Sequence, residues 1–202
     1  MILRHGETAW SVSGQHTGRT DIPLTDNGRA AARALAPHLA GHDFGLIACS
    51  PLQRTRETAR LAGLTPDLLS DDLLEWDYGG FEGRTTSQIR RETGDPDWVI
   101  WNTRVPAGST PGEQPEDVAV RCRRVLEMCH PHLVRGEDVA LVAHGHLLRI
   151  LTATWLELDP RSGRLFTLST GTVSMLGFER AQHVIDLWNA AGLPTPDPTD
   201  RA

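Results

Sequence analysis

The sequence contains no lysine, only three cysteines and no long apolar run. All 20 basic residues are arginines, so an anionic ligand has to be held by guanidinium groups gathered in a cleft. Cys49, Cys122 and Cys129 are too few and too irregularly spaced for a disulfide scaffold, which favours reduced thiols. No segment approaches the roughly 20 apolar residues that span a bilayer, and none resembles a signal peptide. We therefore expect a cytoplasmic protein.

Charge and length narrow the function classes further. The 26 acidic residues outnumber the 20 basic ones, which gives a net charge of −6. This balance argues against nucleic acid or an anionic membrane as a partner, because both attract basic proteins. A small-molecule substrate is the expected partner, and formation of a homodimer is left open. The length of 202 residues suits one domain, which we expect to span residues 1–202.

Short apolar runs alternate with segments of helical periodicity along most of the chain. Thr25 is placed to cap a helix, and Ser50 followed by Pro51 is typical of another helix start. The expected helices cover about residues 25–40, 50–63, 86–93, 96–103, 116–134 and 147–156. The expected strands cover residues 1–3, 44–49, an edge segment near 68–74, 139–143, 164–168, 172–178 and 183–188, the last two as a hairpin.

Alternating strands and helices predict an α/β fold, a three-layer α/β/α sandwich around a mainly parallel sheet. The irregular stretch at about 76–115, with glycine and proline toward its end, is expected to form a short helical cap insertion over the site. The proline-containing tail at about 189–202 is expected to be frayed. In such sheets, ligands bind beyond the carboxyl ends of the strands.

Three of these strand ends carry residues suited to phosphate. The first strand runs into Arg4 and His5, the second is followed by Arg54, and a later one runs into His144. Guanidinium groups bind phosphate oxygens as planar forks, and a neutral imidazole can attack phosphorus. We expect His5 to be the nucleophile, surrounded by the two arginines and a cationic His144. The leaving oxygen also needs an acid, for which Glu75 is the best-placed candidate.

Each of these roles has a competing interpretation. Glu7 lies closer to His5 in the sequence and competes with Glu75 for the role of acid. Burial beside Trp76 and Tyr78 favours the protonated Glu75 that such a role requires. Taken singly, each histidine or arginine is as easily structural, so the combination is what indicates a phosphate site.

A zinc site is another interpretation of the histidines. It would combine His5, His144 and His146 with a carboxylate. The two flanking arginines would repel a dication, so we expect neither a metal nor a cofactor.

Four stretches together resemble the histidine phosphatase superfamily, in its phosphoglycerate-mutase-like branch. They follow the family's order from residue 2 to about residue 178 and are RHGET at 4–8, Ser50-Pro51 with Arg54, Glu75 with Tyr78-Gly79, and AHGH at 143–146. The resemblance implies a phosphohistidine on His5, proton donation by Glu75 and no need for a metal. It also implies a phosphate pocket completed by Arg4, Arg54 and His144, with substrate contacts from Ser11 and Thr17. Ser11 stands where the family usually has asparagine.

Within this branch the residues favour a phosphatase over a phosphoglycerate mutase. Mutases of the branch hold the substrate carboxylate with a lysine and an adjacent arginine pair, and this chain has no lysine. Arg90 and Arg91 could replace that pair, but neighbours on a helix point about 100° apart. The stretches at 75–83 and 144–149, with Trp98 and Trp101, resemble the broad acid phosphatases and the sedoheptulose-bisphosphatase-type sugar phosphatases most closely.

The sequence therefore predicts a metal-independent phosphomonoesterase, an acid or sugar phosphatase that acts through a phosphohistidine on a small phosphorylated metabolite. The alternatives are a phosphoglycerate mutase and a non-catalytic module that binds phosphate or a phosphopeptide. The complete set of site residues argues against the second alternative. Arg19, Arg84 and Arg104 are candidate contacts for a second phosphate or a sugar acid.

Overall fold

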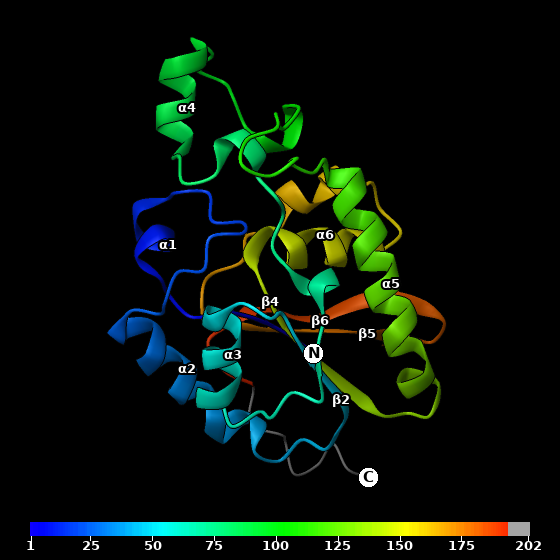
Figure 1. The fold of residues 1–202 in the computed structure, drawn as a ribbon. Helices are drawn as coiled ribbons and strands as arrows, with labels where there is room; N and C mark the ends of the chain where they lie inside the picture. The colour runs from blue at the N-terminus through cyan, green and yellow to red at the C-terminus, as the bar shows by residue number, and fades with distance from the viewer. Residues whose placement is uncertain (194–202) are drawn as a thin grey trace.

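The computed structural model describes residues 1–193 and contains a six-stranded sheet with helices on both of its faces (Figure 1). The strand order is β3-β2-β4-β1-β5-β6, and the first four strands in this order run parallel. Strand β5 pairs antiparallel with both β1 and β6. The predicted sandwich around a mainly parallel sheet is therefore confirmed. The strands are β1 (Ile2–Arg4), β2 (Phe44–Cys49), β3 (Leu68–Leu69), β4 (Asp138–Ala143), β5 (Val173–Glu179) and β6 (Gln182–Ala190).

Two pairs of helices cover the sheet, one pair on each face (Figure 1). Helices α2 and α3 pack against each other on one face, and α5 and α6 pack against each other on the other. The Thr25 side chain accepts a hydrogen bond from the backbone N–H of Gly28, so Thr25 caps α2 as predicted. The α-helices are α1 (Ala9–Ser13), α2 (Asp26–Leu39), α3 (Gln53–Leu61), α4 (Thr86–Thr93), α5 (Pro115–Val134) and α6 (Gly145–Trp155).

The central strand β4 explains why both faces of the sheet need a cover. Successive side chains of a strand point to opposite faces. Val139 and Leu141 belong to the hydrophobic cluster beneath α5 and α6, whereas Ala140 and Val142 belong to the cluster beneath α2 and α3. The run from Val139 to Ala143, which is apolar at every position, is therefore buried on both sides, as in other parallel sheets.

The cap lies over the carboxyl ends of the parallel strands. Helix α4 stands away from the sheet, and the chain after it returns toward α5 and α6 (Figure 1). Trp98 and Trp101 join the core cluster under α5 and α6, so the returning segment is packed against the main body. None of the helices in residues 1–193 has both the length and the apolar character needed to cross a bilayer.

Four predicted elements differ in the structure. The edge strand expected near 68–74 is limited to β3, and Asp71–Leu73 form a 3-10 helix. Helix α3 begins at Gln53 rather than at residue 50, because Leu52 is extended and the Ser50 side chain hydrogen-bonds to a histidine of the site. The predicted helix at 96–103 is reduced to a short 3-10 helix. The predicted strand at 164–168 is wrong. Arg164 and Leu165 end a 3-10 helix, where Arg149 donates to the carbonyls of Gly163 and Arg164, and residues 166–168 are in no helix or strand. The 3-10 helices are η1 (Asp71–Leu73), η2 (Gly79–Phe81), η3 (Ile100–Asn102) and η4 (Pro160–Leu165).

The start of the predicted frayed tail is also wrong. Asn189 and Ala190 are the last residues of β6, and Ala190 pairs with Val173 of β5. Residues 194–202 of that predicted tail lie outside the described residues. The predicted hairpin formed by the last two strands is confirmed.

Candidate active site

The carboxyl ends of β1 and β4 lie side by side and bring two histidines together. Arg4 is paired with Ala143 in the parallel register, so His5 and His144 directly follow the two paired strand ends. The backbone N–H of His5 donates to the Ala143 carbonyl at 3.0 Å, and the two imidazole centroids are 5.3 Å apart. The meeting of strand ends inferred from the sequence is therefore present.

The His5 ring is held in one tautomer. The residue is only 5% exposed, and its Nδ1 lies 2.7 Å from the carbonyl oxygen of Gly6. Because a carbonyl can only accept, Nδ1 carries the proton and Nε2 keeps its lone pair. Burial, followed by the charges of Arg4 and Arg54, holds the pKa of His5 well below its ordinary value. His5 is thus a neutral imidazole with a free nitrogen, the form that can attack phosphorus.

The turn after His5 is fixed by helix α3. The backbone N–H of Gly6 donates to the Thr58 hydroxyl at 2.9 Å, and that hydroxyl donates to the Arg54 carbonyl at 2.7 Å. A β-carbon on Gly6 would lie 2.5 Å from the Gly28 carbonyl oxygen, so a side chain does not fit at this position. Thr58, which the sequence analysis did not single out, ties the turn of His5 to the helix that carries Arg54.

Arg4 brings a guanidinium with an unused donor to the cavity wall. Its Nη1 donates to the Leu168 carbonyl, while its Nε is buried and has no hydrogen-bond partner in residues 1–193. A β-carbon on Gly145 would lie 3.0 Å from the Arg4 Cζ, so this glycine lets α6 begin against the guanidinium. A guanidinium in this wall suits an anion in the cavity as its hydrogen-bond acceptor.

Arg54 and His144 form a fully buried pair next to His5. The Arg54 Nε donates to the His144 Nδ1 at 3.1 Å, so Nδ1 is the acceptor and Nε2 carries the proton, 2.7 Å from the Ser50 hydroxyl. Burial, followed by the charge of Arg54, holds the pKa of His144 well below its ordinary value. The ring is neutral, so the cationic His144 expected from the sequence is wrong for this structure.

Neither Arg54 nor His144 belongs to the cavity wall. Three backbone carbonyls accept hydrogen bonds from the outer nitrogens of Arg54, those of Thr17, Gly18 and Thr20. One of the five guanidinium N–H groups, on Nη1, has no acceptor within the described residues. Direct contact of Arg54 or His144 with phosphate stays a prediction.

Glu75 lies at the N-terminus of α6 and lines the cavity. Its Oε1 accepts from the backbone N–H groups of Trp76 at 2.9 Å and Leu147 at 2.8 Å, and its Oε2 accepts from that of His146 at 3.1 Å. These three bonds orient the carboxylate against the start of α6. Oε2 accepts a single hydrogen bond, which leaves it a lone pair that can carry the proton for a leaving group.

The segment that bears Glu75 is held by Arg121, another residue that the sequence analysis missed. Arg121 is 8% exposed and donates from Nη1 to the Leu74 carbonyl at 2.9 Å. It also forms a paired contact with the Glu113 carboxylate, at 2.7 and 2.8 Å. Glu113 in turn accepts from the backbone N–H of Asp77 at 2.9 Å. Arg121 and Glu113 thus anchor the Glu75 segment to α5 and to the cap.

The side chain of Glu7, the competing acid, is directed to the start of α2. Its Oε1 accepts from the Thr25 hydroxyl at 2.6 Å, at the start of α2. Glu7 lines a separate hollow, which shares Arg4 and Ser11 with the main cavity, and is not part of the wall that contains His5 and Glu75. The geometry therefore favours Glu75 over Glu7 as the acid.

Ser11 and Thr17 both line the cavity, but their hydroxyls already have partners. The Ser11 hydroxyl accepts from the Thr8 backbone N–H and donates to the Thr8 carbonyl, each at 2.9 Å, as part of the capping box of α1. The Thr17 hydroxyl donates to the Gln15 carbonyl at 3.0 Å. Their contact with substrate stays a prediction that requires these bonds to be exchanged.

The outer part of the cavity is aromatic, and of its residues Tyr78, His146 and His16 the sequence analysis missed His16. The Tyr78 hydroxyl hydrogen-bonds to the His146 Nδ1 at 2.5 Å, and the imidazole lies 5.0 Å from the Trp101 ring. Burial raises the pKa of Tyr78 well above its ordinary value, so the phenol stays neutral and donates this bond. His16, also in the wall, donates from Nδ1 to the Arg84 carbonyl at 2.7 Å. The cavity of about 210 Å³ suits a small metabolite.

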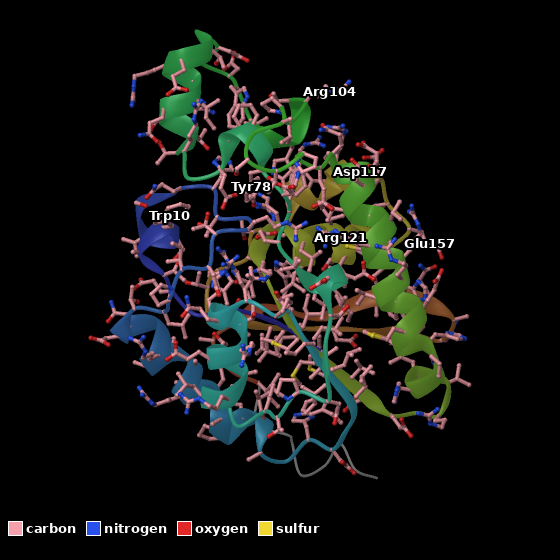
Figure 2. All side chains as sticks on the ribbon, in the orientation of Figure 1. Trp10, Tyr78, Arg104, Asp117, Arg121 and Glu157 are labelled. Carbon is pink, nitrogen blue, oxygen red and sulfur yellow. The ribbon has the colours of Figure 1, made fainter. Side chains whose placement is uncertain are left out.

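The cation of the outer cavity is Arg149, one helical turn after His146 on α6. Its guanidinium carbon lies 4.7 Å from the centroid of the Trp101 ring. Arg19, Arg84 and Arg104, the candidates from the sequence, are absent from the cavity wall, and Figure 2 shows Arg104 at the outer edge of the cap, away from Tyr78. The helical spacing of residues 146 and 149 is the sequence signal that could have identified this arginine.

The structure offers no ligand set for the zinc interpretation within the described part of the chain. No three His, Cys, Asp or Glu side chains of residues 1–193 are grouped so that they could hold a metal ion. Both ring nitrogens of His144 are in hydrogen bonds to Arg54 and Ser50.

The buried neutral histidines predict a loss of stability in acid. Burial is the main cause that holds the pKa values of His5, His144 and His146 well below the ordinary value for histidine. Below about pH 6.5 the unfolded chain therefore binds protons that the folded chain does not. The unfolding free energy decreases as the pH is lowered. Each histidine contributes up to about 1.4 kcal/mol per pH unit.

Urea unfolding at pH 7.5 and pH 5.5, in a buffer free of phosphate, measures this effect. We expect the unfolding free energy to be lower at pH 5.5 by several kcal/mol. A protein that is equally stable at both values would contradict the neutral state of these rings.

Comparison with known proteins agrees with this geometry. The family model described as histidine phosphatase superfamily (branch 1) matches residues 1–191. An acid phosphatase of Mycobacterium tuberculosis is 40% identical over 97% of this chain and 94% of its own length. A sedoheptulose 1,7-bisphosphatase of Saccharomyces cerevisiae is 33% identical over 92% of this chain and 80% of its own length.

A solved structure has the same architecture. The product of an open reading frame of Mycobacterium tuberculosis superposes with a TM-score of 0.85 at 38% identity, covering 93% of this chain and 95% of that one. The family match spans both strand ends that carry the histidines and the cap between them. The chain therefore belongs to the histidine phosphatase superfamily, branch 1, and is a phosphatase.

Proposed function

We propose that the protein hydrolyses phosphomonoesters of small metabolites through a phosphohistidine on His5, without a metal. The observation that carries this proposal is the His5 tautomer. Its Nδ1–H donates a hydrogen bond to the Gly6 carbonyl, which leaves the Nε2 lone pair available. Arg4 lines the same cavity, and its guanidinium suits an anionic substrate.

The proposed reaction has two steps. In the first, Nε2 of His5 attacks phosphorus, the bond from phosphorus to the ester oxygen breaks, and Glu75 gives its proton to the departing alkoxide. In the second, the Glu75 carboxylate takes a proton from water as that water attacks phosphorus. The bond from phosphorus to nitrogen then breaks, which releases inorganic phosphate and restores both residues. Arg4 binds the phosphoryl oxygens in both steps, with Arg54 as the second guanidinium.

The geometry supports a phosphatase better than a mutase. Arg90 donates from Nε to the Trp98 carbonyl at 3.0 Å, and Arg91 is exposed. Neither arginine is in the cavity wall, so the pair that could replace the mutase carboxylate site is not assembled there. Acid phosphatase and sedoheptulose 1,7-bisphosphatase are the names of two relatives, and a sugar phosphate or bisphosphate is the substrate class we propose.

The test is phosphate release from a panel of phosphomonoesters in the presence of EDTA. The panel contains p-nitrophenyl phosphate, phosphoglycerates, fructose and sedoheptulose bisphosphates and a phosphotyrosine peptide. We expect metal-independent release, highest with a sugar phosphate, and an acid-labile, base-stable phosphoenzyme after rapid quenching. Interconversion of phosphoglycerates without release of phosphate would show that the protein is a mutase instead.

A further inference from the structure

The carboxylate of Glu82 lies against the loop of residues 17–20. The backbone N–H of Gly18 donates to both of its oxygens, at 3.0 Å to Oε1 and 2.9 Å to Oε2. The backbone N–H of Thr20 donates to Oε1 at 3.0 Å. Glu82 follows η2 in the same segment as Glu75, but it does not line the cavity and has no part in the proposed reaction.

The opposite side of this loop holds Arg54. The Arg54 Nη2 donates to the carbonyls of Thr17 at 3.3 Å and Gly18 at 3.0 Å, and its Nη1 donates to the carbonyl of Thr20 at 2.9 Å. The loop therefore separates a carboxylate on one side from a buried guanidinium on the other. Its N–H groups face the carboxylate, and its carbonyls face the guanidinium.

One peptide unit joins the two charges directly. The carbonyl of Thr17 and the N–H of Gly18 belong to the same planar trans peptide, in which these two groups point in opposite directions. This peptide accepts from Arg54 at one end and donates to Glu82 at the other, so its dipole is aligned between the two charges. Hydrogen bonds in such a chain polarise and strengthen one another.

Glycine at position 18 is what allows this close approach. A β-carbon there would lie 2.7 Å from the Glu82 Oε2 and 2.6 Å from the Trp76 carbonyl oxygen. The contact between the loop and the carboxylate therefore excludes any side chain at this position. Burial lowers the pKa of Arg54, and the charge of Glu82 opposes this effect, after the larger contributions of Glu75, Asp21 and Tyr78.

We propose that Glu82 is a positioning residue of the phosphate site, which acts through the 17–20 loop to hold the Arg54 guanidinium in place. This inference rests on the proposed function in one respect, the role of Arg54 in phosphate binding. With its carbonyls turned toward Arg54, the loop fixes three of the guanidinium donors and so determines where the remaining Nη1 N–H points. It also keeps the Arg54 Nε on His144, 3.1 Å away, beside the nucleophile.

The test is a double-mutant cycle read by binding of inorganic phosphate, which needs no turnover. Calorimetric titration is carried out on the wild type, Glu82→Gln, Arg54→Lys and the double variant. Glu82→Gln keeps the size of the side chain but places an NH₂ donor against the Gly18 N–H. We expect Glu82→Gln to raise the phosphate Kd about tenfold in the wild-type background and less than about twofold in the Arg54→Lys background.

Two controls separate this role from a general loss of structure. Glu92→Gln changes an exposed glutamate of α4 that pairs with Arg84, and is expected to leave the phosphate Kd unchanged. Gly18→Ala places a β-carbon against the Glu82 carboxylate and so displaces the loop, which is expected to raise the Kd about as much as Glu82→Gln. Gly18→Ala also provides the measurement if Glu82→Gln does not fold.

If Glu82→Gln changed the phosphate Kd equally in both backgrounds, Glu82 would act on the structure independently of Arg54, and the proposal would be overturned. An unchanged Kd in the wild-type background would overturn it as well. Failure of the proposed reaction is a different result. Hydrolysis that survives His5→Ala would reject the phosphohistidine mechanism, while the coupling between residues 82 and 54 in phosphate binding would still be measured.

Discussion

Replacing His5 by alanine is expected to lower the kcat for phosphomonoester hydrolysis by about 10⁴-fold or more, because the variant has no nitrogen to attack phosphorus. The neighbouring groups cannot substitute for it. His144 has both ring nitrogens in hydrogen bonds, to Arg54 and to Ser50. The measurement is phosphate release from p-nitrophenyl phosphate and from the best metabolite substrate, together with trapping of the phosphoenzyme.

The fold of this variant is expected to survive. The backbone N–H of His5 bonds to the Ala143 carbonyl, and that of Gly6 bonds to the Thr58 hydroxyl, and neither bond uses the imidazole. Thermal unfolding and binding of inorganic phosphate serve as the controls for structure. If a folded His5→Ala protein hydrolyses its substrate at the wild-type rate, the phosphohistidine mechanism is wrong.

Glu75→Gln is expected to reduce kcat by about 10²- to 10⁴-fold for substrates with an alkoxide leaving group, because an amide is too weak an acid to protonate the leaving oxygen. The effect with p-nitrophenyl phosphate should be much smaller, since nitrophenolate leaves without protonation. Comparison of kcat for these two kinds of substrate therefore separates loss of the acid from general disturbance. Such disturbance is a real concern, because the Glu75 carboxylate accepts three backbone hydrogen bonds at the start of α6 and beside Trp76.

Glu7→Gln is the matched control, since Glu7 is the other carboxylate close to His5 in the sequence. Its oxygen accepts from Thr25, outside the cavity, so we expect kcat to change by less than about threefold for either substrate. A large loss in Glu7→Gln that grows with the basicity of the leaving group, without one in Glu75→Gln, would transfer the role of acid to Glu7.

Most of the fold could be predicted because its signals are local. The capping threonine of α2, the apolar run of β4 and the helical spacing of α5 each depend on neighbouring residues. The errors arose where a distant group competes with the local pattern. The stretch at 164–168 is apolar enough for a strand. At its start, however, Arg149, about 15 residues earlier, donates hydrogen bonds to the carbonyls of Gly163 and Arg164. Ser50 suits a helix cap, but its hydroxyl is taken by His144.

The sequence by itself determined which groups meet at the site. Parallel strands end at one edge of a sheet, so the residues that follow β1 and β4 are expected at the same edge. The structure adds that these two strands are direct neighbours. His5, Arg4 and His144 could therefore be identified before any coordinates were known. The resemblance to a known family added the order of the motifs and the substrate contacts expected from Ser11 and Thr17.

Only the tertiary structure decided the protonation states, the competing acid and the cation of the outer cavity. These depend on burial and on hydrogen bonds between residues far apart in the chain, such as Arg54 with His144 and Glu7 with Thr25. The same is true of Arg149, which faces the cavity where Arg104 does not, and of Glu82, whose partners lie more than 60 residues earlier. Pattern in a sequence records spacing along the chain, whereas a pKa or a contact depends on distance in space.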